Sequence, residues 1–280
     1  MIIVNLTGGL GNQMFQYAFV KELQSRGIKA YSNFYQLGKD RDIEKAFNIE
    51  PSKKEKNITS FFSKNIIFRL LRKFFIIHII EPQSLYSTYD SKYLSDKHIL
   101  PLHYVGTWQS ERYFEGIKNS IDSIFKFANK LSNNTCNWRD KISSSPNSVA
   151  IHIRRGDYLK PEYITLFGGI CTLDYYYDAI NYIEKKVSNP SYFIFTNDAA
   201  WVESNLKIDN SFLVEGNDGE DSWQDMYLMS LCKHAVIANS TFSWWGAYLN
   251  KNKRKIVIAP RKWFNTIEAP DIVPSNWIRL

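Results

Sequence analysis

The sequence predicts an α/β protein made of two halves, each with a parallel β-sheet that has helices on both faces. Short runs of β-branched and aromatic residues alternate with segments of helical periodicity, which is typical of parallel sheets. The 280 residues suit one large domain or two compact ones. An Asn- and Ser-rich segment, 129–148, interrupts the pattern. We therefore expect two Rossmann-like domains, 1–145 and 146–280, with a cleft between them.

The first element of the N-terminal half is a buried strand over residues 2–6, followed by a glycine loop. A helix from Asn12 to about Arg26 is expected next, because apolar residues recur there at four-residue spacing (Phe15, Phe19 and Leu23). Gly27 stands where a glycine often ends a helix. Residues 51–64 have the composition of a polar excursion, and we expect a strand over 103–108 and a helix over 114–131.

The segment 66–80 is strongly apolar but is interrupted by Arg69, Arg72 and Lys73. Crossing a membrane takes about 20 uninterrupted apolar residues, so we expect no transmembrane helix. On a helix the three charges form one basic stripe. This stripe indicates either a peripheral contact with anionic lipid or a mostly buried helix with one wet face, and the second interpretation is favoured.

The C-terminal half has a clearer α/β alternation. We expect strands over 149–153, 191–197, 234–239 and 255–260. Helices fit between them, notably over 173–187 and 221–232.

Composition limits the classes of function. The 44% apolar content excludes wholesale disorder, and 3 cysteines are too few for a disulfide framework. The N-terminus has no pattern of a secretory leader, so we expect a cytoplasmic protein. A net charge of +7 fits nucleotide or phosphate ligands, and no RNA or DNA motif accompanies it.

Three segments concentrate polar residues at strand-to-helix junctions. The first, Thr7 to Gln13, is a glycine turn whose following helix offers backbone N–H groups to an anion, although a structural turn uses the same glycines. It lacks the defining spacing of the NAD and P-loop motifs. Asn12 fits either a ligand contact or a helix N-cap.

The second segment, His152 to Tyr158, follows a strand, at the sheet edge where open parallel sheets bind ligands. Alternation places His152 and Arg154 on one face and the neighbouring isoleucines on the core side. Arginine suits a bidentate hold on phosphate, and a salt-bridge network that includes Asp157 is the alternative. Of the two arginines, Arg155 is the better candidate for a structural role.

The third segment, Ala238 to Gly246, runs from a strand through a small polar turn into a helix. Its hydroxyls and N–H groups suit a diphosphate, while a plain capping turn with Trp244 and Trp245 in the core is the alternative.

Together the motifs resemble the α-1,2-fucosyltransferase family, which is related to α-1,6- and protein O-fucosyltransferases. The resemblance rests on GGLGNQMFQYAF (8–19), HIRRGDY (152–158), FTND (195–198) and NSTFSWWGAYL (239–249), and residues 30–145 carry none of it. It implies a GT-B-like fold, an acceptor-binding N-terminal half and a C-terminal half that binds GDP-β-L-fucose. It also implies inverting transfer to a galactose 2-hydroxyl without a metal or other cofactor, as in the synthesis of surface polysaccharides such as O-antigen.

The resemblance also implies roles for individual residues. Arg154 would hold the β-phosphate and offset the charge on the departing GDP. Asp157 is the first candidate for the general base, with Glu162 second, unless Asp157 pairs with Arg155 or the departure of GDP runs ahead of attack. The remaining donor contacts would come from Asn12, Gln13, His152, Asp198, Asp225, Asn239, Ser240, Thr241 and Phe242.

Other functions stay open on the sequence. One is a glycosyltransferase of the same fold that uses another GDP-sugar. Another is a non-catalytic carbohydrate-binding protein, given 15% aromatic residues, and a third is a nucleic-acid binder. The acceptor is either a free sugar or a lipid-linked oligosaccharide, and in the second case residues 66–80 would contact the membrane.

Overall fold

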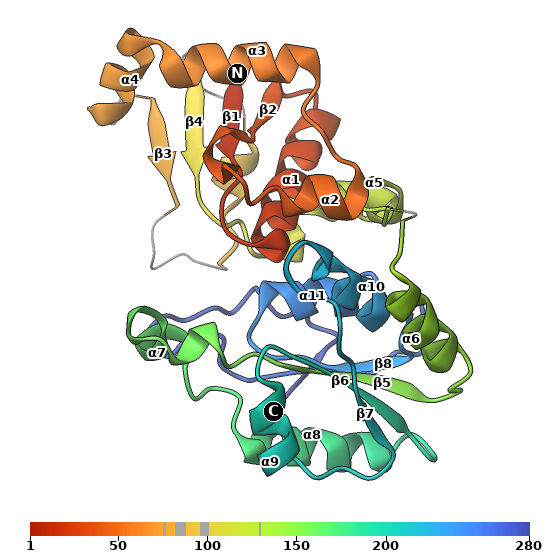
Figure 1. Ribbon diagram of the computed structural model, residues 1–280. Coiled ribbons are helices and arrows are strands. Elements are labelled where there is room, and N and C mark those ends of the chain that lie inside the picture. The colour runs from red at the N-terminus through yellow and green to blue at the C-terminus, as the bar shows by residue number, and fades with distance from the viewer. Residues whose placement is uncertain (75–76, 82–87, 96–100, 129) are drawn as a thin grey trace. The chain divides into compact units, whose positions relative to one another are not determined.

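The computed structural model describes residues 1–74, 77–81, 88–95, 101–128 and 130–280. The chain divides into two compact units (Figure 1). Unit 1 comprises residues 1–128 and 269–274, and unit 2 comprises residues 129–268 and 275–280. The division falls before the predicted boundary at 145, because α6 (Asn133–Ser143) packs on α10 (Trp223–Leu231) of unit 2.

Within the described residues, unit 1 has a parallel sheet with the strand order β2-β1-β4-β3. Its strands are β1 (Ile2–Asn5), β2 (Ala30–Asn33), β3 (His78–Ile80) and β4 (Leu102–Val105). Side chains alternate along β1, so that Ile2 and Val4 pack with α1 (Leu10–Ser25), while Ile3 packs with Phe62 on the opposite face. The expected strand at 2–6 is confirmed, and the sheet has a helix layer on each side.

Among the described residues, the other helices of unit 1 are short. They are η1 (Tyr35–Leu37), α2 (Asp42–Phe47), α3 (Lys53–Lys64), α4 (Ile66–Lys73), η3 (Ser91–Leu94), η4 (Glu111–Ser120) and α5 (Ile121–Ile124). Among the described residues, no helix is both long and apolar enough to cross a membrane.

Several expectations for unit 1 are wrong. Residues 53–64 form a helix rather than a polar excursion, because Ser52 and Glu55 cap each other's backbone N–H groups at its start. The helix expected over 114–131 is instead 3-10 helix and one α-turn, broken at Phe114, whose ψ of 25° and φ of −139° are not helical. The segment 66–80 is α4 followed by β3, with residues 75–76 outside the described residues.

Helix α1 ends as predicted but begins earlier. Gly27 has φ +79°, the left-handed conformation that glycine adopts without strain, and its N–H donates to the Gln24 carbonyl. The N-cap is Gly9 rather than Asn12, which lies inside the first turn. The N-cap interpretation of Asn12 is therefore wrong.

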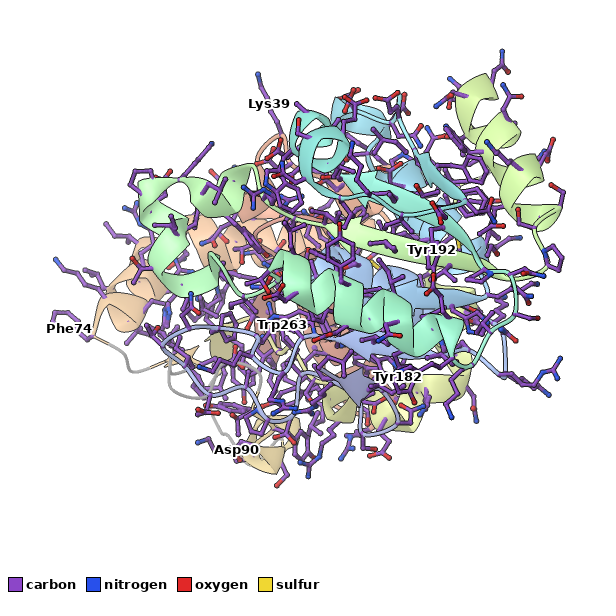
Figure 2. All side chains as sticks on the ribbon, turned by 90° about the horizontal axis from the view of Figure 1, so that it is seen from below. Lys39, Phe74, Asp90, Tyr182, Tyr192 and Trp263 are labelled. Atoms are coloured by element: carbon purple, nitrogen blue, oxygen red, sulfur yellow. The ribbon has the colours of Figure 1, made fainter. Side chains whose placement is uncertain are left out.

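Unit 2 has a parallel sheet with the order β10-β9-β8-β5-β6-β7 among the described residues. Its strands are β5 (Ser148–Ile153), β6 (Ser191–Thr196), β7 (Ser211–Leu213), β8 (His234–Val236), β9 (Val257–Ala259) and β10 (Ile278–Arg279). The four predicted strands are confirmed, and the added edge strands β7 and β10 are short. Tyr192 on β6, labelled in Figure 2, is buried in this unit.

Helices cover both faces of the second sheet. They include η5 (Asp157–Leu159), α7 (Pro161–Phe167), α8 (Leu173–Glu184), α9 (Ala199–Asn205), η6 (Gly219–Asp221) and α11 (Thr241–Tyr248), besides α6 and α10. The α/β class with parallel sheets that the sequence predicts is thus confirmed.

Candidate active site

The candidate site lies in unit 2, where β5 ends. Ile151 and Ile153 point to the α8 side and belong to its core, as alternation predicts. His152 points the other way, where its ring centroid is 5.9 Å from that of Phe242 at the start of α11. The strand therefore directs His152 toward α11.

Arg154 is held by Asp157. Its Nε lies 2.8 Å from Asp157 Oδ1, and its Nη2 donates to Asp157 Oδ2 at 2.8 Å. Asn197 Nδ2 donates to Oδ1 of the same carboxylate at 3.1 Å. Burial acts to raise the pKa of Asp157, but the hydrogen bond and the charge of Arg154 outweigh it, and the pKa lies below its usual value. The carboxylate is thus ionised and weakly basic, and both of its oxygens already contact other side chains. Its charged partner is Arg154 rather than Arg155.

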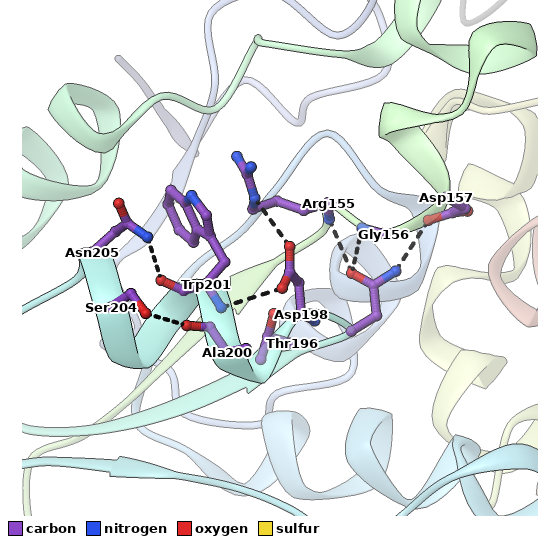
Figure 3. Close-up of polar contacts among 10 residues, drawn as sticks. Arg155, Gly156, Asp157, Thr196, Asp198, Ala200, Trp201, Ser204 and Asn205 are labelled. Atoms are coloured by element: carbon purple, nitrogen blue, oxygen red, sulfur yellow. Dashed lines mark hydrogen bonds and ion pairs between the residues drawn. The ribbon is translucent and has the colours of Figure 1, made fainter.

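Arg155 is fixed on the other side of the loop (Figure 3). Its guanidinium lies over the Trp201 ring at 4.0 Å, and its Nε lies 3.4 Å from Asp198 Oδ2. The other oxygen of Asp198 accepts the N–H of Trp201 and so caps α9. This arrangement favours structural roles for Arg155 and Asp198, and the predicted donor contact of Asp198 stays a prediction.

His152 is a neutral histidine. Burial, with a contribution from the charge of Arg154, lowers its pKa to about 3. Its Nδ1 is buried and has no hydrogen-bond partner in the structure, an uncommon state for a buried polar atom. A polar ligand atom that reaches Nδ1 would satisfy it, as a donor or as an acceptor according to the tautomer of the ring.

Asp225 lies in the first turn of α10. Burial raises the pKa of its carboxyl to about 7, although the side chain of Asn217 donates to it at 2.8 Å. Such a carboxyl exists in both its protonated and its ionised form near neutral pH. A perturbed acid of this kind is more common at functional sites than elsewhere.

The third motif contains an asparagine that holds neighbouring segments together and the residues at which α11 begins. Asn239 is 2% exposed, and its amide donates to the carbonyls of Phe167 and Trp263 at 3.2 and 3.1 Å, so it connects its own loop to the end of α7 and to the segment after β9. Ser240 precedes α11 without capping it through its side chain, and Thr241 and Phe242 open the helix. Trp244 and Trp245 are both fully buried, as the core interpretation predicts.

The glycine turn of the first motif belongs to unit 1. Gln13 is fully buried, where its amide donates to the carbonyls of Gly8 and Asp40 and accepts the N–H of Ile43. Asn12 accepts a hydrogen bond from Gln109. Gly8 has φ +74°, a conformation in which other residues are strained, and a Cβ there would lie 2.7 Å from the Asn12 amide nitrogen. These contacts show a structural use for both residues, and their donor contacts stay predictions.

A cavity of about 130 Å³ lies beside the second motif. Arg154, Arg155, Tyr158, Cys171, Trp201 and Asn239 contribute to its lining. Glu162 is on the exposed first turn of α7. Among the described residues, no group of three His, Cys, Asp or Glu side chains is placed to hold a metal ion.

Three residues of this region were not singled out from the sequence. Asn197 accepts the backbone N–H groups of Arg155 and Gly156 at 2.9 and 3.2 Å, and so fixes the loop that carries Arg154. Trp201 supports Arg155, and Asn217 supports Asp225. Only Asn197 had a signal, its place in the FTND motif.

Comparison with known proteins places the chain in a family. The signature of the family described as glycosyl transferase family 11 matches residues 1–280. An α-1,2-colitosyltransferase of Escherichia coli is 34% identical, with 100% of this chain and 99% of that protein covered. The O-antigen biosynthesis glycosyltransferase WbnK of Escherichia coli is 31% identical, with 98% and 99% covered.

The fold also has a solved counterpart. The crystal structure of NodZ α-1,6-fucosyltransferase soaked with GDP-fucose has a TM-score of 0.56 at 13% identity, with 89% of this chain and 92% of that chain covered. At this identity the likeness concerns the fold, which is the expected GT-B-like class. From the signature over its whole length and the two full-length relatives, the chain belongs to glycosyl transferase family 11.

Proposed function

We propose that this glycosyltransferase is an α-1,2-fucosyltransferase. It transfers L-fucose from GDP-β-L-fucose, with inversion, to the 2-hydroxyl of a β-galactoside. The observation that carries the proposal is Arg154, fixed by Asp157 where β5 ends, in a chain whose full-length relatives include an α-1,2-glycosyltransferase. The crystals of NodZ, which shares the fold, were soaked with GDP-fucose.

The diphosphate of the donor binds Arg154 and the first turn of α11. A guanidinium has five N–H donors, and the contact with Asp157 orients it before the donor arrives. The N–H groups at the start of a helix have no partner within the helix and attract anions. As the bond between fucose C1 and the phosphate oxygen breaks, both groups stabilise the negative charge on GDP.

The nucleoside binds His152 and Asp225. The neutral His152 forms a hydrogen bond at Nδ1, and the ionised Asp225 accepts one from a hydroxyl or amino group. His152 is buried and Asp225 is half-buried, so a polar group left without a partner here would be costly, which makes the recognition selective.

The acceptor hydroxyl attacks C1 on the face opposite GDP and loses its proton. Asp157 is a weak candidate for this base, because its oxygens contact Arg154 and Asn197 and its pKa is lowered. We assign Asp157 to positioning Arg154, and we retain Glu162 as the carboxylate to test for proton removal.

A transfer assay read by mass spectrometry tests the reaction. The protein is mixed with GDP-fucose and a panel of β-galactosides, with EDTA present throughout. We expect a product heavier by one fucosyl unit, with the linkage at galactose O2. Absence of transfer, of GDP release and of GDP binding would overturn the proposal.

Colitosyl transfer is the second candidate, because the 34% identical relative is named for it. Colitose is fucose without the 3-hydroxyl, so the two donors differ by one polar group. A site that hydrogen-bonds a hydroxyl rejects the deoxy analogue strongly. Parallel assays with GDP-fucose and GDP-colitose distinguish the two candidates. If kcat/KM is at least about 10-fold higher for GDP-colitose, colitose replaces fucose as the proposed donor sugar.

A further inference from the structure

The outer side of α3 and α4 is unusually apolar. We define the α3–α4 surface by five side chains that are 49–69% exposed, namely Phe61, Ile66, Ile67, Leu70 and Phe74. Four of them recur at helical spacing along α4 and its end, so they share one side of that helix. Figure 2 shows Phe74 at the edge of the view, where the described part of this helix ends. The favoured interpretation of a mostly buried helix is wrong, because α4 has no buried residue.

The inner side of the same helices fixes this orientation. Phe68 packs on the buried Phe62 with ring centroids 4.7 Å apart. The guanidinium of Arg72 donates to the carbonyls of Phe62 and Ser63 at 3.0 and 3.4 Å, so it turns toward α3 and leaves the predicted basic stripe. Asn65 ends α3 and caps α4 through its side chain. The apolar residues therefore face outward in a folded, anchored element.

Positive charge is concentrated in the same two helices. Residues 53–73 contain seven Lys and Arg against Glu55 alone, a net charge of +6, whereas the whole chain has +7. The rest of the chain is thus nearly neutral. Six of the seven cations are exposed, namely Lys53, Lys54, Lys56, Lys64, Arg69 and Lys73.

We propose that the α3–α4 surface docks on a bilayer that contains anionic lipids. Apolar side chains on one helix side with flanking Lys and Arg are the pattern of helices that lie in the membrane interface. The apolar groups enter the acyl boundary, and the cations pair with the headgroups. A second copy of the chain suits this surface poorly in a symmetric contact, because two segments that each carry a net charge of +6 would repel each other.

Vesicle sedimentation with the full-length chain tests the charges. We expect binding to vesicles of phosphatidylcholine with phosphatidylglycerol, and little to phosphatidylcholine alone. Each cation near an anionic surface contributes roughly fivefold, so K64Q/R69Q/K73Q should weaken binding about 100-fold. The matched control K185Q/K186Q/K253Q removes the same charge from exposed positions of unit 2 and should weaken it less than about fivefold.

A second pair of variants tests the apolar groups. I67S/L70S should lower binding to the anionic vesicles at least about 10-fold, whereas I67V/L70I should bind like the wild type. Equal binding of both triple variants would overturn the proposal. So would an absence of vesicle binding, whether or not the protein self-associates. Circular dichroism confirms that each variant is folded.

Discussion

Asp157 holds Arg154 through both carboxylate oxygens, each 2.8 Å from a guanidinium nitrogen. The pair lies where β5 ends and both side chains are about one-third exposed, so the arginine is oriented without being buried. A pre-positioned cation of this kind stabilises a leaving diphosphate without reorganisation at the moment of reaction.

Replacing Arg154 by alanine should lower kcat at least ~100-fold, because in the proposed reaction the charge on the departing GDP would lose its main stabilising group. Steady-state kinetics with GDP-fucose measure the effect. Arg155→Ala is the matched control, since Arg155 stacks on Trp201 instead, and its kcat should fall far less. Similar losses in both variants would remove the distinction between the two arginines.

Asp157→Asn should lower kcat about 10- to 100-fold through misplacement of Arg154. If Asp157 only positions Arg154, the pH–rate profile keeps its shape. Loss of the acidic limb in this variant, but not in Glu162→Gln, would instead identify Asp157 as the base.

The affinity for GDP should rise between about pH 6 and 8. The pKa of Asp225 is raised to about 7, so the carboxyl is mostly protonated below that pH and becomes the stronger, ionised acceptor above it. Titration calorimetry across this range should show an increase of about 10-fold in the wild type. Asp225→Asn should bind with little pH dependence, and an unchanged step in that variant would exclude Asp225 as its source.

Acid should destabilise unit 1 through His103. This side chain is 3% exposed, its Nε2 lies 2.6 Å from Asn5 Oδ1, and burial lowers its pKa to about 3. Because the unfolded chain binds the proton near pH 6.5, stability is present above that pH and is lost as the pH falls toward 3.

His103 alone should contribute a loss of about 2 kcal/mol at pH 5 relative to pH 7, because each pH unit between its two pKa values contributes about 1.36 kcal/mol. Urea denaturation at the two pH values measures it. His103→Gln should lose roughly 2 kcal/mol less than the wild type over the same interval. Identical pH dependence in the two proteins would contradict the assignment.

The sequence predicted the parallel sheets and the direction of His152, because alternation along a buried strand is a local property. It did not predict α3, because the Lys-rich composition of this segment indicated a polar surface segment and the capping pair of Ser52 and Glu55 was not recognised. It missed β7 and β10, since short edge strands carry few buried residues.

The site was predicted as a set of motifs rather than as contacts. Asp157 pairs with Arg154 rather than with Arg155 because of how the loop turns after β5. Asn197, at the end of β6, fixes that turn. Likewise, the raised pKa of Asp225 follows from burial that no local pattern reports. Such features arise between segments distant in the chain, where periodicity carries no information.

The central claim is that the nucleotide binds at this edge of the second sheet. The most direct test is titration calorimetry of the wild type and of Arg154→Ala with GDP, together with titration of the wild type with UDP. The wild type should bind GDP and discriminate against UDP, and the variant should bind GDP at least about 10-fold more weakly, as expected when one strong charge-assisted contact is lost. Unchanged GDP affinity in a folded Arg154→Ala protein would contradict the account.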